Sequence, residues 1–142
     1  EIKVARIAFI DGIGRVLFEN RRGLKNDGFN GDYLLFGGKL EGSESPEQTV
    51  VREVKEELGY SLREGMSRYF GTYESQLTEE VHTTDYIYVS RFHGWNNLRS
   101  REGHSMTLTP IYSAREKRIP PIYQKILDDL EASLRDLGFL PP

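Results

Sequence analysis

Hydrophobic positions cluster or alternate over short stretches along much of the chain, and this pattern predicts a domain rich in β-strands. Residues 2–10 combine alternation with an apolar run, and apolar residues return at 16–18 after a polar segment, 11–14, that contains Asp-Gly. Because Asp-Gly tolerates the positive φ of tight turns, we expect a hairpin here. Further strands are predicted at 33–36, 69–76, 83–92 and 106–111. The double glycine at 37–38 is expected to break the strand before it.

Two amphipathic segments predict helices. In the first, over residues 46–58, Ser45 is the expected N-cap, Pro46 takes the first helical position, and Gln48 completes a capping box. Gly59 is expected to end this helix, whose apolar stripe is formed by Val50, Val51, Val54 and Leu58. The second helix follows Pro120-Pro121 and is expected to close at Gly138, with a stripe of Ile122, Ile126, Leu130, Leu134 and Leu137.

Length and composition exclude several classes of protein. The 142 residues fit one domain, which we expect over 1–142. Cysteine is absent, so disulfides, thiolate metal sites and thiol nucleophiles are excluded. A net charge of -3 argues against broad nucleic-acid binding. No apolar stretch reaches the roughly 18 residues that a membrane span needs. We therefore expect a cytoplasmic α/β protein with a central mixed β-sheet sandwiched between helices.

Three carboxylates crowd one edge of the predicted helix 46–58. At about 100° per residue, Glu53, Glu56 and Glu57 fall within an arc of roughly 100°. These like charges repel one another, and they lie in the later part of the helix, where its dipole disfavours anions. A compensating cation is expected. Oxygen-only ligands favour Mg²⁺ or Mn²⁺ over zinc, and the three histidines lie in separate segments.

The segment 38–60, GKLEGSESPEQTVVREVKEELGY, resembles the Nudix box in every fixed position. These positions are Gly38, Glu44, Arg52, Glu53, Glu56, Glu57 and Gly59, with Val54 and Tyr60 at the apolar places. The resemblance implies the Nudix fold, an α/β/α sandwich. It also implies a divalent-metal-dependent pyrophosphohydrolase that cleaves a nucleoside diphosphate linked to another moiety, by attack of water on phosphorus.

The resemblance to MutT-type members extends beyond the box and assigns further residues. Leu35-Phe36-Gly37-Gly38-Lys39-Leu40-Glu41 resembles a segment in which the carbonyl of the first glycine, here Gly37, is a metal ligand. Glu102, in a late Arg-Glu-Gly, resembles a loop glutamate that completes the metal shell; an ordinary loop acid is the equal alternative. Gly38 and Lys39 are assigned to substrate binding.

Within the box, we assign Glu56 and Glu57 to metal binding, and Glu53 is either a ligand or the general base. By helical geometry Arg52 is expected to point away from the acidic arc and to orient loop carboxylates such as Glu44, with direct phosphate binding as the minor alternative. Gly38, Glu44 and Gly59 are assigned structural roles in the motif.

The substrate is left open between a nucleoside triphosphate and a nucleoside diphosphate sugar. Arg21 and Arg22 are candidates for phosphate or base binding, since guanidinium groups suit phosphate oxygens, or they form a solvated strand end. Tyr123 stands where MutT-type enzymes carry a base-reading asparagine, which puts cleansing of oxidised dGTP in doubt. The alternatives are hydrolysis of RNA 5′ caps or dinucleoside polyphosphates, and a non-catalytic nucleotide-binding module. A monomer or homodimer is expected.

Overall fold

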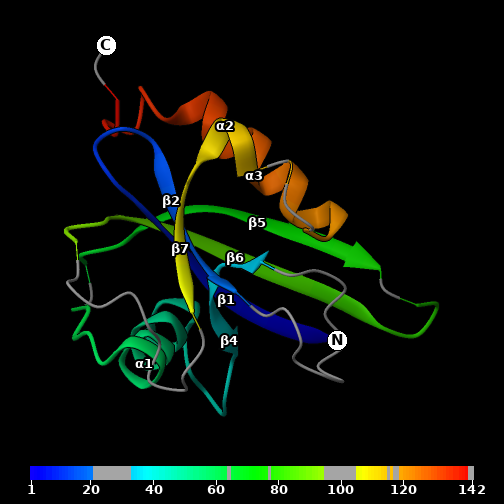
Figure 1. The fold of residues 1–142 in the computed structure, drawn as a ribbon. Coiled ribbons are helices and arrows are strands. Elements are labelled where there is room, and N and C mark those ends of the chain that lie inside the picture. Colours follow the sequence, from blue (N-terminus) through cyan, green and yellow to red (C-terminus); the bar gives the residue numbers. More distant parts are fainter. Residues whose placement is uncertain are drawn as a thin grey trace. The chain divides into compact units, whose positions relative to one another are not determined.

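The computed structural model describes residues 1–20, 33–63, 65–76, 78–94, 105–114, 116 and 119–140. The elements follow one another as β1 (Ile2–Ile10), β2 (Arg15–Asn20), β3 (Tyr33–Leu34), β4 (Phe36–Lys39), α1 (Pro46–Leu58), β5 (Arg68–Gln76), β6 (His82–Arg91), β7 (Met106–Pro110), α2 (Ile111–Ala114) and α3 (Pro121–Ser133). Figure 1 shows these elements along the chain.

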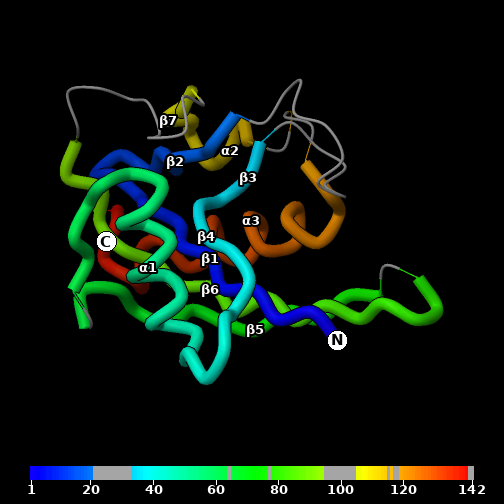
Figure 2. The backbone as a smooth tube through the Cα atoms, turned by 90° about the horizontal axis from the view of Figure 1, so that it is seen from below, coloured from blue at the N-terminus to red at the C-terminus, as the bar shows by residue number. Residues whose placement is uncertain are grey.

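The chain forms two compact units that share strand β1. The first unit comprises Glu1–Ala8 and Leu35–Ser90, and the second Phe9–Leu34 and Arg91–Pro142. Strands pair in the order β3-β2-β1-β6-β5, while β4 also pairs with β1 and β7 with β2. The pairs β1–β2, β1–β4, β2–β3, β2–β7 and β5–β6 are antiparallel. Figure 2 shows β5 and β6 side by side as one long hairpin.

The turn between β1 and β2 differs from the expected tight Asp-Gly hairpin. Positive φ occurs at Gly14, at 83°, and not at Gly12. Asp11 organises the turn because its Oδ1 accepts hydrogen bonds from Ile13 N at 3.1 Å and Arg15 N at 2.8 Å. Asp11 therefore shapes the turn through its side chain, and the residue with positive φ is Gly14 instead of Gly12.

Gly37 and Gly38 do not break a strand, so that expectation is wrong. They lie inside β4, where Gly37 is opposite Arg6 and Gly38 is opposite Ala5 of β1. A Cβ atom on Gly37 would lie 2.7 Å from Arg6 Cα, and the φ of Gly37 is +149°. Glycine is therefore needed here for close approach of two paired backbones.

Helix α1 confirms the predicted bounds and cap. Ser45 Oγ accepts from Gln48 N at 3.1 Å, and Gln48 Oε1 accepts from Ser45 N at 2.9 Å. Gly59 ends the helix with φ 70°. The buried stripe differs from the predicted one: Thr49, Val50 and Val54 are buried, whereas Val51 and Leu58 are partly exposed. Helix α1 packs against β4 in the first unit.

The second unit ends in helices whose bounds differ from the prediction. The strand predicted to reach 111 ends at Pro110, and Ile111 begins the short helix α2, which packs against β7 and α3. Helix α3 ends at Ser133, before the predicted close at Gly138. The chain turns there instead, with Phe139 N donating to Leu134 O at 2.9 Å and Phe139 only 6% exposed. Gly138 takes the left-handed conformation, with φ 85°, at the end of this turn.

The expected α/β class, with a mixed central sheet and flanking helices, is confirmed. The expectation of one domain over 1–142 stays a prediction. None of the helices in the described ranges is long and apolar enough to cross a membrane.

Candidate active site

Arg52 on α1 is the centre of a network of hydrogen bonds in the box segment. Its Nε donates to Glu44 Oε2 at 2.7 Å and its Nη2 to Glu44 Oε1 at 3.1 Å, so the guanidinium grips both oxygens of one carboxylate. Nη2 also donates to Lys39 O at 3.0 Å. This arrangement ties the loop between β4 and α1 to the helix, and the expected contact between Arg52 and Glu44 is present.

The expectation that Arg52 points away from the acidic arc is wrong. Its Nη1 donates to Glu53 Oε1 at 2.9 Å and to Glu56 Oε2 at 3.3 Å. Helical geometry fixes only the direction in which a side chain leaves the backbone, whereas a guanidinium group carries donors on several sides and has a long stem. Arg52 therefore bridges the loop acid and two of the three helix acids.

The network sets the charge state of Glu44. The hydrogen bonds from Arg52, followed by that from Glu41 N, lower the pKa of the Glu44 carboxyl from 4.5 to about 2. Thr49 Oγ1 adds a further hydrogen bond at 2.9 Å. In turn, the hydrogen bond to Glu44 raises the pKa of Arg52 above its ordinary value. The pair is therefore fully ionised near neutral pH, in a partly exposed setting.

Gly38 makes room for the Glu53 carboxylate. A Cβ atom on Gly38 would lie 2.6 Å from Cδ of Glu53 and close to both carboxylate oxygens. Glu53 is the more enclosed helix acid, with its side chain 17% exposed against 57% for Glu56. Strand β4 and helix α1 therefore contact each other where the Gly38 backbone lies against the Glu53 carboxylate, and this contact requires glycine.

The three helix acids offer hard oxygen donors at one end of α1. Glu53 lies against Gly38, Glu56 is exposed, and Glu57 is partly exposed. Gly37 immediately precedes Gly38 in β4. Carboxylate and carbonyl oxygens of this kind bind Mg²⁺ or Mn²⁺ and not soft metals. Glu53, Glu56 and Glu57 are therefore candidate ligands for a divalent cation.

Other predicted site residues are placed as follows. Arg21, Arg22 and Glu102 lie outside the described residues. Lys39 is exposed at the end of β4. Tyr123 is only 6% exposed in α3, among the residues that form the core of the second unit. Its role toward substrate stays a prediction.

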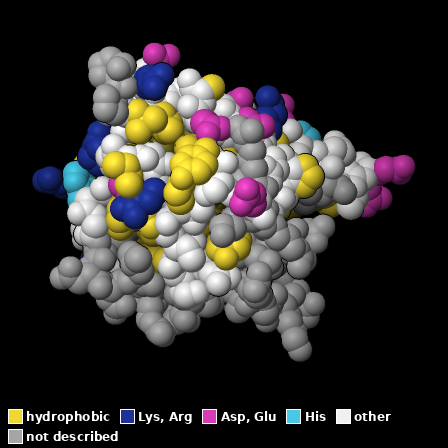
Figure 3. All heavy atoms as spheres, turned by 45° about the horizontal axis from the view of Figure 1, so that its top comes forward, with side chains coloured by type: hydrophobic (Ala, Val, Ile, Leu, Met, Phe, Trp, Pro, Cys, Tyr) yellow, Lys and Arg dark blue, Asp and Glu magenta, His cyan; other side chains and the backbone are white. Residues whose placement is uncertain are grey.

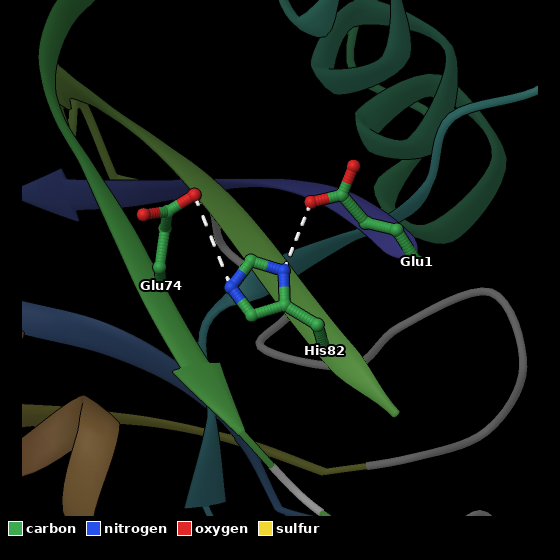
Figure 4. Close-up of side chains that lie close together, drawn as sticks. All are labelled: Glu1, Glu74 and His82. Carbon is green, nitrogen blue, oxygen red and sulfur yellow. Dashed lines mark hydrogen bonds and ion pairs between the residues drawn. The ribbon is translucent and has the colours of Figure 1, made fainter. Parts of the chain in front are cut away.

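A second group of polar side chains, not expected from sequence, joins the start of β1 to the β5–β6 hairpin. His82 Nδ1 lies 3.0 Å from Glu1 Oε2, and His82 Nε2 lies 3.9 Å from Glu74 Oε1 (Figure 4). One ligand atom from each of these three residues lies within 4.8 Å of the other two, so the group could hold a metal ion. Only the β5–β6 register, which sequence does not supply, brings Glu74 near His82.

The surface carries charges of both signs. Figure 3 shows Lys and Arg side chains in separate groups on the described part of one face, with Asp and Glu side chains and hydrophobic ones among them. Ile13 and Tyr112 are the most exposed large hydrophobic residues of the described ranges, at 69% and 72%.

The chain belongs to the Nudix domain family, whose model matches residues 2–130. The match takes in the whole box segment and most of both units. With its box intact, the chain is a Nudix hydrolase, an enzyme that acts on phosphoanhydride bonds.

Solved structures share the fold. The MutT protein from Methanosarcina mazei Go1 is 20% identical with a TM-score of 0.73, and the match covers 96% of this chain and 95% of that one. The NUDIX domain of Shewanella oneidensis NrtR, complexed with ADP ribose, is 13% identical with a TM-score of 0.71, covering 94% and 88%. A C. elegans Ap4A hydrolase is 12% identical with a TM-score of 0.72, covering 96% and 99%. Likeness at these identities concerns the fold alone.

Proposed function

We propose that this Nudix hydrolase is a divalent-metal-dependent pyrophosphohydrolase of small nucleotides, either nucleoside triphosphates or nucleoside diphosphate sugars. One water is added across a P–O–P link: the water oxygen bonds to one phosphorus, the bridging oxygen leaves with the other, and the water proton goes to solvent through a base. A triphosphate then yields a monophosphate and pyrophosphate. A nucleotide sugar yields a monophosphate and a sugar phosphate.

The main support for this proposal is the contact between Glu53 and Gly38. A carboxylate pressed against a glycine backbone, and fixed by Arg52 Nη1 at 2.9 Å, is positioned with little freedom. Glu56 and Glu57 follow on the same helix. This arrangement supports a site that positions phosphate oxygens and a water molecule, and catalysis of phosphoryl transfer consists mainly of such positioning.

The donor set fits Mg²⁺ or Mn²⁺. Glu53, Glu56, Glu57 and the carbonyl of Gly37 would hold the ion, because all of them present hard oxygen atoms from one end of α1 and the adjoining strand. When bound, the ion neutralises phosphate oxygens and lowers the pKa of a coordinated water.

The chain's own residues have distinct tasks in this scheme. Arg52 binds the loop after β4 through Glu44, and it binds the helix acids Glu53 and Glu56. These contacts fix the positions of the carboxylates relative to one another. Lys39 is exposed at the end of β4, and its assigned task is to bind a substrate phosphate. Glu53 either binds the ion or accepts the proton of the attacking water, and the pH profile of Glu53→Gln separates these two roles.

A substrate panel tests the proposal by product identity. The chain is incubated with Mg²⁺ or Mn²⁺ and with nucleoside triphosphates, nucleotide sugars, dinucleoside polyphosphates and capped RNA. Release of a nucleoside monophosphate with pyrophosphate or with a sugar phosphate is expected. Binding of these nucleotides without any product would indicate a non-catalytic module and would contradict the proposal.

A further inference from the structure

Two acids and one imidazole meet in the first unit, on residues that do not belong to the box segment. Glu1 directly precedes β1, Glu74 lies in β5, and His82 is the first residue of β6. One ligand atom from each of these residues lies within 4.8 Å of the other two. The group therefore has the spacing of a small metal site and shares no residue with the candidate active site.

The sheet brings these three residues together. In the β5–β6 hairpin, Gln76 lies opposite His82 and Glu74 lies opposite Thr84. Alternate residues of a strand point to the same face, so Glu74 and His82 share one face of the hairpin. Strand β1 is the neighbour of β6 on its other side. The ligand positions are therefore set by three adjacent strands, which hold a site more precisely than loops do.

Thr84 orients the Glu1 carboxylate. Its Oγ1 donates to Glu1 Oε2 at 2.8 Å, and Thr84 is only 5% exposed. This hydrogen bond, followed by that with His82, holds the pKa of Glu1 below its ordinary value. Glu1 is therefore an ionised carboxylate near neutral pH. A buried hydroxyl that fixes a carboxylate in this way is typical of the contacts that support metal ligands.

The His82 ring lies with both nitrogens toward the two carboxylates (Figure 4). Nδ1 lies 3.0 Å from Glu1 Oε2, and Nε2 lies 3.9 Å from Glu74 Oε1. Because the outer torsion of histidine is broad, a modest rotation turns one nitrogen into the space between the acids. Four-coordinate Zn²⁺ places its ligand atoms about 3.4 Å apart, so no pair of ligand atoms needs to close by more than about 1.4 Å. The Glu74 side chain is 64% exposed and can make this adjustment.

The donor set favours zinc over magnesium. Two carboxylates and a neutral imidazole carry two negative charges, which a divalent cation neutralises. Mg²⁺ prefers oxygen ligands and retains its water molecules, whereas imidazole nitrogen suits Zn²⁺ and its neighbours in the first transition row. Zn²⁺ also accepts glutamate oxygens, and three protein ligands leave its fourth position for water.

We propose that Glu1, Glu74 and His82 bind one Zn²⁺ ion at a site separate from the Mg²⁺ or Mn²⁺ site proposed on α1. The bound ion ties the start of β1 to the β5–β6 hairpin and stabilises the folded chain, because an ion that binds only the folded state shifts the unfolding equilibrium. This inference does not depend on the substrate or on turnover.

The test is a Zn²⁺ titration of the whole chain after removal of metal with EDTA and desalting. Zn²⁺ is partitioned between the protein and a chromophoric chelator in excess Mg²⁺, which occupies the acids of α1. The variants that remove ligands are His82→Gln and Glu74→Gln. His93→Gln is the matched control, since His93 is exposed and lies in the second unit. Glu57→Gln is the control for zinc bound at the box, and melting curves with and without Zn²⁺ are recorded for every variant.

Wild type is expected to bind one Zn²⁺ in excess Mg²⁺ and to melt at a higher temperature when Zn²⁺ is present. His82→Gln and Glu74→Gln should each raise the Kd for Zn²⁺ at least about 10-fold and lose most of the rise in melting temperature. His93→Gln and Glu57→Gln should keep a Kd within about twofold of wild type.

Two results would overturn the inference. The first is that wild type binds no Zn²⁺ in excess Mg²⁺. The second is that Zn²⁺ binding is lost in Glu57→Gln or His93→Gln and retained in His82→Gln and Glu74→Gln. Because Glu74 is an exposed side chain, its replacement tests the site even if His82→Gln fails to fold.

Discussion

Arg52 donates hydrogen bonds to both carboxylate oxygens of Glu44, which lies eight residues earlier in the sequence, with donor–acceptor distances of 2.7 and 3.1 Å. The same guanidinium reaches Glu53 through its remaining nitrogen. One side chain therefore links the loop after β4 to the acids of α1, and the loop geometry and the acid geometry depend on each other.

Replacing Glu44 by Gln is expected to lower both activity and melting temperature. The amide keeps the shape but loses the charge that holds Arg52, so Arg52 is freer to shift toward Glu53 and Glu56. Activity against the best substrate and melting temperature are measured together. Thr78→Ala, in the turn between β5 and β6, serves as a control for removal of a loop hydrogen bond far from the site in sequence. Unchanged activity in Glu44→Gln would contradict the linkage.

The stability that the ionised Glu44 supplies should depend on pH in a defined window. The folded pKa is about 2 against 4.5 for the free group, so the contribution is fully present above about pH 4.5 and is lost as pH falls toward 2. The difference in melting temperature between wild type and Glu44→Gln is therefore expected to be constant at higher pH and to shrink over this window. A difference in melting temperature that grows as the pH falls would contradict this prediction.

Gly38→Ala is expected to displace the Glu53 carboxylate while leaving the fold intact. The added methyl group would lie 2.6 Å from Glu53 Cδ, and the flexible end of the glutamate yields more readily than paired backbone. Activity should fall, and the Mg²⁺ concentration for half-maximal activity should rise. Gly12→Ala is the matched control, since its Cβ would meet only Arg91 Nη1 at 3.7 Å. Equal behaviour of the two variants would contradict the proposed contact.

Ser45→Ala should destabilise the chain through the start of α1. The Ser45 hydroxyl accepts from Gln48 N at 3.1 Å, and loss of such a cap costs about 1 kcal/mol of unfolding free energy. Chemical denaturation of wild type and Ser45→Ala measures the difference. Ser45→Asn, which retains a capping oxygen, is expected to recover most of it. If Ala and Asn give the same stability, the cap contributes nothing.

Helix α1 could be predicted because its signals are local. Ser45, Gln48 and Gly59 act within one helical turn of the ends, and the box spacing lies inside a single element. The role of the glycine pair could not be predicted this way. Glycine is needed at 37 and 38 because Arg6 and Glu53, which are distant in sequence, lie against these positions. The local tendency of glycine to end strands therefore gave a wrong prediction.

Side-chain reach accounts for the other differences at the site. The helical position of Arg52 indicates one direction, yet its guanidinium contacts acids on two sides. The group of Glu1, Glu74 and His82 depends on a strand register that periodicity does not determine. The core position of Tyr123 depends on how α3 packs, whereas its sequence context indicated only a place near a substrate.

Product release from the preferred nucleotide by wild type and Glu57→Gln, each with Mg²⁺ and with EDTA, tests the proposed metal-dependent site most directly. Wild type with Mg²⁺ is expected to release a nucleoside monophosphate, and EDTA is expected to abolish this release reversibly. Glu57→Gln should keep the wild-type melting profile and lose about 10²–10³-fold in kcat, the typical cost of removing one electrostatic stabiliser. Full wild-type activity in EDTA, or full activity of Glu57→Gln, would contradict a metal-dependent site at the carboxylates of α1.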